Sequence, residues 1–278
     1  MDRELVLAGL ALTTVGFSLL MAGIWSRSIT PPASAQQWER TLWRALWRPV
    51  IPAVLMVSVL LGWAIMEPAQ SDEHLPSSVL IVSAGFIGLW LRAAFRATVA
   101  LKARTPHVAG TVGLWRARMV LSDRLIARLD ADALEAVRSH EAAHVRHRDP
   151  LRIWIAQLVT DLQWPWPAAQ HRFAQWRHVL ELARDEEARL SGTDGADLAA
   201  AVLLAARLYT VCPPGATLID GQVGLEARIT RLLAPVPAGE APIAMTSPLT
   251  LFPVSLLGVL SGVRFGEGFV QALVRWLP

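Results

Sequence analysis

Residues 139–144 are Ser-His-Glu-Ala-Ala-His, and the rest of the chain can be interpreted from this stretch. Positions four apart lie on one face of a helix, one turn from each other, so His140 and His144 can both direct an imidazole at a single metal ion. Glu141 directly follows the first histidine, where its carboxylate can reach a water molecule on the metal without binding the metal itself. The pattern predicts a metal-binding helix over residues 131–148, with Glu141 as general base.

A second segment, residues 181–185, can complete such a site. Two histidines leave a catalytic zinc ion one protein ligand short, and a carboxylate from another helix commonly supplies it. Glu181 and Asp185 lie four apart and face the same way on a helix. One of them can bind the metal while the other holds the far nitrogen of a ligating histidine, and the spacing leaves open which does which. Each segment alone could be a solvated polar helix, whereas the two together favour a zinc site.

The sequence resembles a known family at these segments. Residues 139–151, Ser-His-Glu-Ala-Ala-His-Val-Arg-His-Arg-Asp-Pro-Leu, and residues 180–188, Leu-Glu-Leu-Ala-Arg-Asp-Glu-Glu-Ala, are similar to the integral-membrane zinc metallopeptidases of the BlaR/MecR type, which sense β-lactams in bacteria. The resemblance runs from about residue 105 to residue 233. It implies a gluzincin-like domain in which Glu181 is the third zinc ligand and Asp185 supports the site from behind the ligands.

The chain differs from that family in two respects. Arg138 stands where zinc-peptidase helices usually carry an uncharged residue. In addition, only residues 265–278 follow the last apolar segment, whereas the β-lactam sensors carry a large external domain. A segment this short rarely folds without disulfide bonds or a bound metal. We therefore do not expect the chain to bind β-lactams by itself. An external signal would then arrive through a membrane sensor partner, through the lipid bilayer or through a change in how the spans pack.

The composition is that of a membrane protein with a modest polar domain. Hydrophobic residues make up 53% of the chain and charged residues 18%, and the mean hydropathy is +0.38. The net charge is only +3, and no basic stretch is interleaved with stacking aromatics, so we expect no direct nucleic-acid binding. The single cysteine, Cys212, excludes an internal disulfide and a thiolate zinc site.

Apolar segments predict four transmembrane helices, at residues 5–25, 50–66, 75–94 and 241–263. Arginine is abundant in the link at 26–49 and absent from the loop at 67–76, and Arg92 and Arg96 lie near the end of the third span. By the positive-inside rule, the N-terminus is external and the polar domain lies in the cytoplasm. The family resemblance implies that the membrane is a bacterial inner membrane. Three tryptophans in the link predict an interfacial helix along the lipid headgroups: Trp38, Trp43 and Trp47.

The division into domains follows from these spans. Residues 1–104 hold three spans and the basic cytoplasmic link, residues 105–237 form the peptidase domain, and residues 238–278 form the fourth span and a short external tail. In the fourth span, Pro248 and Pro253 predict either a kink, which could act as a hinge, or irregular first turns.

Within the polar domain, short apolar pieces predict strands at Thr111–Trp115 and Arg118–Leu121. The second strand is our candidate for holding substrate by strand addition, with an ordinary structural hairpin as the alternative. The helix that carries Glu181 is expected at residues 168–190. His178 lies three residues before Glu181 on the same face and could stabilise an oxyanion, with a solvated histidine as the alternative.

These observations predict an α-helical membrane protein with about four transmembrane helices and a cytoplasmic, mainly helical, gluzincin-like zinc peptidase domain that carries a small β element. His140, His144 and Glu181 would hold Zn²⁺, and Glu141 would take a proton from water during attack on a peptide carbonyl.

The substrate would be a protein, and the resemblance points to a transcriptional repressor in regulated signalling. Two other classes stay open, a non-catalytic membrane signalling or scaffold protein that retains the zinc-peptidase fold, and a small transporter. The sequence does not indicate the oligomeric state.

Overall fold

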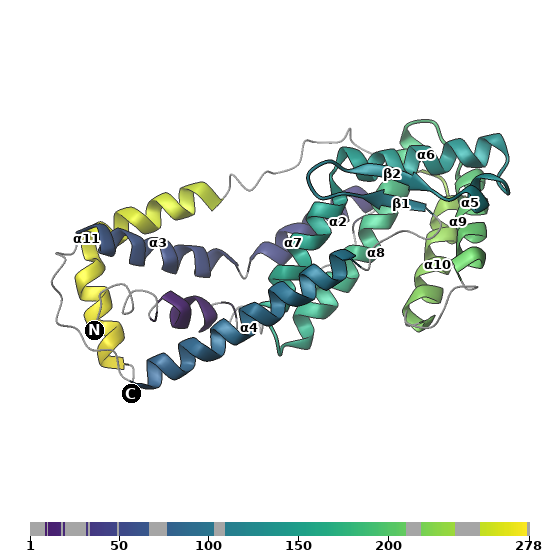
Figure 1. Cartoon of the computed structure of the whole chain (residues 1–278). Coiled ribbons are helices and arrows are strands. Elements are labelled where there is room, and N and C mark those ends of the chain that lie inside the picture. Colours follow the sequence, from purple (N-terminus) through teal and green to yellow (C-terminus); the bar gives the residue numbers. More distant parts are fainter. Residues whose placement is uncertain are drawn as a thin grey trace.

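The computed structural model of the chain describes residues 9, 11–17, 19, 32, 34–48, 50–66, 77–102, 109–209, 218–236 and 251–276. These residues form helices and one small sheet, as the sequence predicts. Figure 1 shows that three helices, α3, α4 and α11, lie apart from the group of helices that carries the sheet, and these three are called the long helices below. The bounds of the long helices are Val50–Met66, Ser77–Lys102 and Leu251–Trp276. The group that carries the sheet contains α5 (Asp123–Ile126), α6 (Ala131–Arg146), α7 (Asp149–Asp161), α8 (Pro167–Leu190), α9 (Gly195–Tyr209) and α10 (Leu218–Leu233).

The sheet is a single antiparallel hairpin. Strand β1, Ala109–Val112, pairs with β2, Arg118–Leu121, so that the first residue of each strand faces the last residue of the other. The prediction of a strand at Arg118–Leu121 is confirmed. The other strand begins earlier than predicted, and it also ends earlier, because Gly113 has a φ of +93° and turns the chain directly after Val112.

Helix α6 carries the histidine motif and contacts α7, α8, α9 and both strands. Asp130 caps its first turn by accepting a hydrogen bond from the backbone N–H of Ala133. The helix ends at Arg146, two residues before the predicted end, because Arg148 adopts a left-handed conformation with a φ of 52°. Helix α9 packs against α6, where Val137 of α6 and Ala201 of α9 share a buried cluster.

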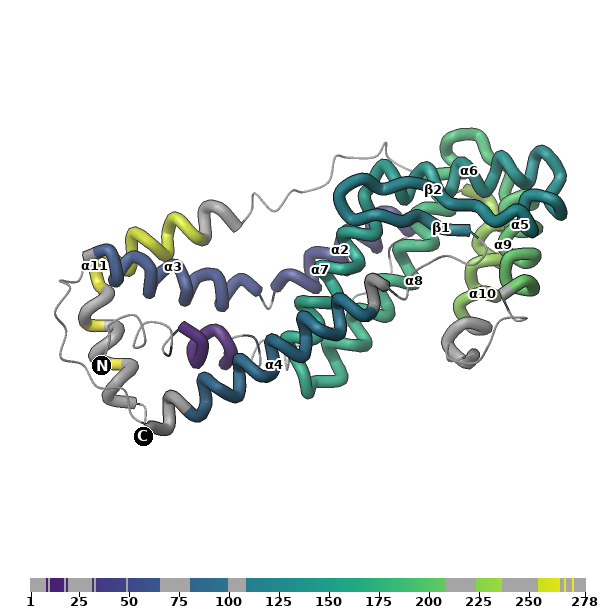
Figure 2. The backbone as a smooth tube through the Cα atoms, in the orientation of Figure 1, coloured from purple at the N-terminus to yellow at the C-terminus, as the bar shows by residue number. Residues whose placement is uncertain are grey.

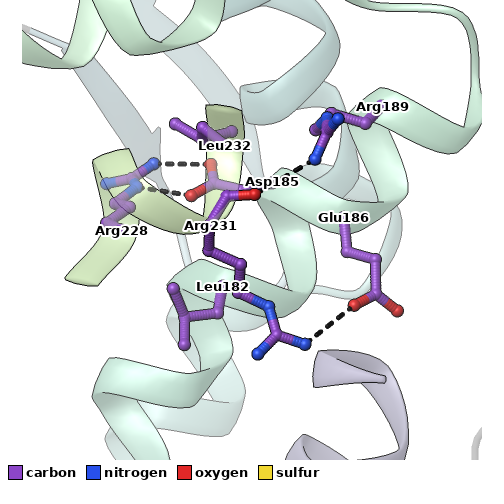
Figure 3. Close-up of a pocket in the computed structure, with 7 residues that line it drawn as sticks. All are labelled: Leu182, Asp185, Glu186, Arg189, Arg228, Arg231 and Leu232. Atoms are coloured by element: carbon purple, nitrogen blue, oxygen red, sulfur yellow. Dashed lines mark hydrogen bonds and ion pairs between the residues drawn. The ribbon is translucent and has the colours of Figure 1, made fainter. Parts of the chain in front are cut away.

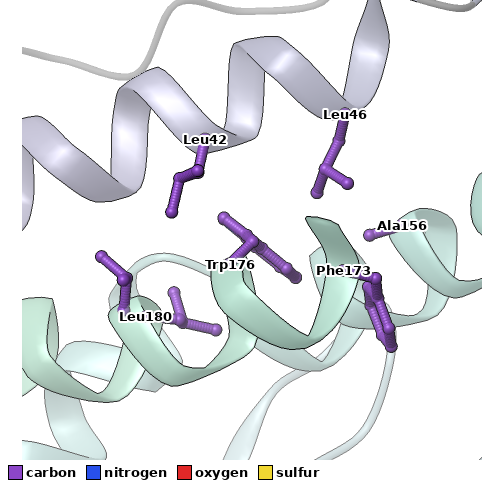
Figure 4. Packing of buried hydrophobic residues seen from close by; sticks show 7 residues of the cluster. Leu42, Leu46, Ala156, Phe173, Trp176 and Leu180 are labelled. Atoms are coloured by element: carbon purple, nitrogen blue, oxygen red, sulfur yellow. The ribbon is translucent and has the colours of Figure 1, made fainter. Parts of the chain in front are cut away.

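Helix α2, Ala35–Trp47, packs on α8 and α7. Leu42 and Leu46 belong to one buried cluster with Trp176, which Figure 4 shows between the two helices. Trp38 and Trp43 pack against the same cluster, and the ring of Trp43 lies 5.1 Å from that of Trp176. The sequence predicts that the apolar face of this helix lies in the lipid headgroups. This prediction is wrong, because the face packs against α8. An amphipathic pattern shows that one face is buried but does not show what buries it.

The C-terminal half of helix α4 packs against α7. The guanidinium of Arg92 lies over the ring of Trp164 at 5.0 Å, and Arg96 forms an ion pair with Asp161 at 3.3 Å. The two arginines that the sequence places at a membrane interface thus also contact the polar domain.

Helices α3 and α11 run side by side, as Figure 2 shows, and they approach closely because glycine lines their contact. A Cβ atom on Gly62 would overlap the backbone of Val259, and one on Gly262 would overlap the backbone of Val59. Close backbone approach at small residues is typical of helix pairs in membranes.

The predicted spans are only partly covered by the structure. No single helix among the described residues is both long and apolar enough to cross a membrane, although α2 and α3, bent by 40° where they meet, satisfy both conditions as a pair. Most of the predicted span at 5–25, and Pro248 in the predicted fourth span, lie outside the described residues. Pro253 lies in the first turn of α11, where a proline removes no helical hydrogen bond, and the predicted kink or irregular first turn stays a prediction.

Candidate metal centre

The predicted ligands come from two neighbouring helices. Helix α6 presents His140 and His144 one turn apart, and α8 places Glu181 opposite them. The two histidine Nε2 atoms lie 3.1 Å apart, and the Glu181 Oε2 atom lies 3.5 Å from one and 3.7 Å from the other. Ligand atoms on a tetrahedral zinc ion, each about 2.0–2.1 Å from the metal, lie about 3.3 Å from one another. The three ligand atoms are therefore spaced for one ion of that size.

Both histidines are buried, and each has a carboxylate behind it. Asp149 Oδ2 lies 2.8 Å from His144 Nδ1 in a well-aligned hydrogen bond. Asp185 Oδ1 lies 2.8 Å from His140 Nδ1, although the ring nitrogen does not point straight at it. Such carboxylates hold the imidazole rings with their Nε2 atoms toward Glu181 and make them better ligands.

The electrostatics of the site favour a cation between the two rings. Burial would lower the pKa of His144, but the charge of Glu181 and the hydrogen bond with Asp149 raise it to about 10. Burial acts in the same direction on His140, whose pKa is nevertheless raised by Asp185. A metal ion bound at this place would replace the protons that these carboxylates attract.

Asp149 is a site residue that the sequence pattern does not identify. Asp149 is the first residue of α7, directly before Pro150. Its buried carboxylate also accepts two hydrogen bonds from Arg184, at 2.6 and 3.0 Å. Burial would raise the pKa of Asp149, but Arg184 and His144 hold it far below its usual range. The available signal is its position five residues after His144, just beyond the left-handed turn at Arg148.

Arg228 of α10 is a second such residue. Its guanidinium donates to both carboxylate oxygens of Asp185, at 2.6 and 2.8 Å (Figure 3). It also lies 3.4 Å from Glu181 Oε2 and 3.3 Å from His140 Nε2. Burial would lower the pKa of Arg228, but the charges of Asp185 and Glu181 outweigh this effect and raise the pKa above its usual value. The side chain therefore stays charged. Arg228 belongs to the run at 226–233 that contributes to the family resemblance, but no role follows from that run alone.

Glu141 lies between two cavities. The hydroxyl of Thr111, in β1, donates to Glu141 Oε2 at 2.9 Å. A largely apolar cavity of about 300 Å³ opens on the α9 side, and a more polar one of about 430 Å³ opens on the α7 side. Ala109, Glu141 and Glu181 line both cavities. A peptide lying along β1 would therefore pass the ligand cluster with room on either side.

Neither of the other two predicted site elements lines the two cavities beside Glu141. Strand β1 borders both cavities, whereas Arg118 of β2 lines a separate cavity at the hairpin turn together with Trp115. The strand-addition role therefore suits β1 better than Arg118–Leu121. His178 packs beside Gly224 and is absent from the lining of the two cavities beside Glu141, so its role as an oxyanion stabiliser stays a prediction.

Comparisons with known proteins agree with this site. A family model described as BlaR1 peptidase M56 matches residues 96–204. The matched range contains α6, α7 and α8, and with them the three ligands and both supporting carboxylates, whereas Arg228 lies beyond it. No match is found among curated proteins or among solved structures. The resemblance that the sequence indicates is confirmed for residues 96–204, which carry the His-His-Glu cluster and match the BlaR/MecR-type M56 peptidase family.

Proposed function

We propose that this protein is a membrane-embedded, zinc-dependent endopeptidase that cleaves a cytoplasmic or membrane-proximal protein. The observation that carries the proposal is the cluster of His140, His144 and Glu181, spaced for one ion, with Glu141 beside it and a cavity on each side. The M56 family match supports peptidase chemistry. Space on both sides of the reacting groups suits cleavage inside a chain, held in extended form along β1.

Each residue has a part in this chemistry. A zinc ion held by His140, His144 and Glu181 would supply Lewis-acid activation of water and of the peptide carbonyl. Glu141 would accept the proton of the attacking water and pass it to the departing amine nitrogen. The hydrogen bond from Thr111 holds the Glu141 carboxylate on the β1 side of the cluster, where the substrate backbone would lie.

Arg228 is also suited to the reaction. Negative charge develops on the carbonyl oxygen during attack and needs a donor or cation close by. Arg228 lines the apolar cavity together with His140 and Glu181. We assign it the stabilisation of that charge, in addition to its contact with Asp185.

The membrane placement and the substrate class are further parts of the proposal. Helices α3, α4 and α11 would lie in a bacterial inner membrane, with the metal centre on the cytoplasmic side. The apolar composition, the distribution of arginine between the predicted spans and the glycine contact between α3 and α11 support this placement. The substrate would be a transcriptional repressor, as in the family that the chain resembles.

The alternative is a scaffold that keeps the fold and binds a partner without turnover. A scaffold would need the three ligands for stability, but it would have no use for Glu141, which is not one of them. The position of this carboxylate between the ligand cluster and the two cavities favours the enzyme.

Two substitutions test the proposal. Protein purified in detergent should contain stoichiometric zinc, and His140→Ala should lose it. Glu141→Gln should keep zinc and thermal stability but lose turnover by about 100-fold or more, the usual contribution of a general base. Turnover is followed by comparing protein N-termini in cells that express the wild type or Glu141→Gln. Equal turnover would contradict the mechanism, and wild-type protein without zinc would contradict the proposal as a whole.

The membrane placement has its own test. A reporter fused after residue 75 should behave as external, and one fused after residue 104 as cytoplasmic. The opposite result would reverse the orientation without affecting the metal centre.

A further inference from the structure

A continuous series of polar contacts joins the ligand His144 to helix α2, far away in sequence. His144 Nδ1 lies 2.8 Å from Asp149 Oδ2, and the other oxygen of Asp149 accepts a hydrogen bond from Arg152 Nη1 at 2.9 Å. The second terminal nitrogen of Arg152 donates to Oε1 of Glu39 on α2. One guanidinium therefore bridges two carboxylates, one behind the metal ligand and one on a helix outside the matched family segment.

Aromatic rings enclose this bridge. The guanidinium of Arg152 lies 4.5 Å from the ring of Trp43 and 5.5 Å from the ring of Trp176. The indole N–H of Trp176 donates to the same oxygen of Glu39 at 2.9 Å. Glu39 and Arg152 are each only 5% exposed, so water cannot replace a lost partner, and the loss of one charge leaves the other uncompensated.

Two arginines share the carboxylate of Asp149, and of these Arg152 is the one with a hydrogen bond to α2. Arg184 of α8 binds both oxygens from within the family segment. Arg152 divides its donors between Asp149 and Glu39, so the pull it exerts on Asp149 depends on whether Glu39 is in place. The orientation of the carboxylate that faces His144 is thus set by three donors, one of which is anchored to α2.

We propose that Glu39 and Arg152 are positioning residues of the metal centre, which fix Asp149, and through it the ring of His144, when α2 is docked. The inference rests on the proposed zinc site and adds a means of regulating it. Only two residues separate the end of α2 from the start of α3, so a shift of α3 would be carried to Glu39 without a long link. The packing of the long helices would then change the affinity for zinc.

The test compares Glu39→Gln with Glu186→Gln in the full-length chain in detergent. Glu186 also binds α2, accepting hydrogen bonds from the Ser34 hydroxyl at 2.6 Å and the Ala35 N–H at 2.7 Å, but it takes no part in the series that ends at His144. Both substitutions replace a buried carboxylate at the α2 contact by its neutral amide, so both should loosen α2 and lower the melting temperature. Only Glu39→Gln should weaken zinc binding, by about tenfold, the lower end of the effect of losing a group behind a ligand.

Zinc affinity is measured by competition with a chelating dye, and the geometry of the site by the absorption bands of Co²⁺ bound in place of zinc. The cobalt bands should change in Glu39→Gln and stay unchanged in Glu186→Gln. Arg152→Lys, which keeps the charge but has one donor nitrogen in place of the two that reach Asp149 and Glu39, should reproduce the change. If Glu39→Gln does not fold, Glu39→Asp, which shortens the reach and keeps the charge, takes its place.

The outcomes separate this inference from the proposed function. Zinc affinity equal to that of the wild type in Glu39→Gln, or equal losses in the Glu39 and Glu186 variants, would overturn the inference and leave the zinc site standing. Wild-type protein that binds neither Zn²⁺ nor Co²⁺ would overturn the proposed function itself.

Discussion

The metal centre depends on single charges that are paired behind its ligands. Asp185 is 4% exposed, and burial would raise its pKa, but Arg228 and His140 beside it lower the pKa instead. An ionised carboxylate in such a place depends on its cation, because a buried charge without a partner is strongly destabilising. Asp149 stands in the same relation to Arg184. The histidine motif therefore works only together with charges from other helices.

Arg228→Met should damage both the fold and the site. The substitution leaves the charge of Asp185 uncompensated, so we expect a loss of about 3–5 kcal/mol in the free energy of unfolding. Zinc affinity should fall by about 10–100-fold, because Asp185 no longer holds His140 in place. Chemical unfolding and zinc competition measure the two effects.

Arg231→Met, one turn further along α10, is the matched control. Its contact with Glu186 is 3.5 Å long and partly exposed, so its loss should cost about 1 kcal/mol or less and leave zinc affinity unchanged. Equal losses of zinc affinity in the two variants would show that Arg228 acts only through general stability.

The stability of the α6–α8 contact should depend on pH through Glu187. This residue accepts hydrogen bonds from Arg146 and His147, each at 2.8 Å. Burial would raise the pKa of Glu187, but the hydrogen bonds from His147 and Arg146 lower it from 4.5 to about 2. A carboxylate with a lowered pKa stabilises the fold above its unfolded pKa and loses that contribution as the pH falls through the folded pKa.

Glu187→Gln should therefore lower the melting temperature at pH 7, by an amount equivalent to about 2 kcal/mol after allowance for partial exposure. The difference between variant and wild type should shrink as the pH falls from 4.5 towards 2. Both proteins are measured without zinc, since protonation of the ligands would otherwise contribute. A difference of the same size at pH 7 and at pH 2.5 would count against the ionised hydrogen bond.

At the scale of the elements, local patterns predict the helices that carry the ligands, but not the contacts between helices. The predicted helix at 131–148 runs Ala131–Arg146 and the one at 168–190 runs Pro167–Leu190, because caps, prolines and residue spacing are local signals. The contact of α2 with α8 has no local signal, since its tryptophans suit a lipid surface and a protein core equally well. For the same reason the pairing of Arg228 with Asp185, 43 residues apart, needs the folded structure.

Strand β1 should influence catalysis through Thr111. Thr111→Val keeps the branched shape of the side chain but removes the hydroxyl that binds Glu141. We expect kcat/KM to fall about tenfold, the effect of losing one hydrogen bond to a charged group, with zinc content and melting temperature close to the wild type. Thr111→Ser restores the donor and should restore the rate. Wild-type activity in Thr111→Val would mean that Glu141 is oriented by other contacts.

In the whole molecule, two routes connect the metal centre with the long helices, and both reach α7. Helix α2 leads into α3 and contacts Arg152, while α4 holds the far end of α7 through the ion pair of Arg96 with Asp161. Helix α7 begins at Asp149, against the ligand His144. A displacement of either long helix would thus be passed to the carboxylate behind a metal ligand.

The arrangement of the long helices should depend on Gly262. The helices α3 and α11 are in contact there, with the Gly262 position facing the backbone of Val59 and of Gly62. Leucine at this position must push the helices apart, and overpacking of a close contact costs about 1–3 kcal/mol.

Gly268→Leu, on the same helix, is the matched control because a Cβ atom at Gly268 meets nothing within 4 Å. The melting temperature in detergent should fall by several degrees for Gly262→Leu and stay near the wild type for Gly268→Leu. Zinc stoichiometry at low temperature should be retained in both, since the ligands lie on α6 and α8. Equal melting temperatures for the two variants would mean that α3 and α11 do not rely on this contact.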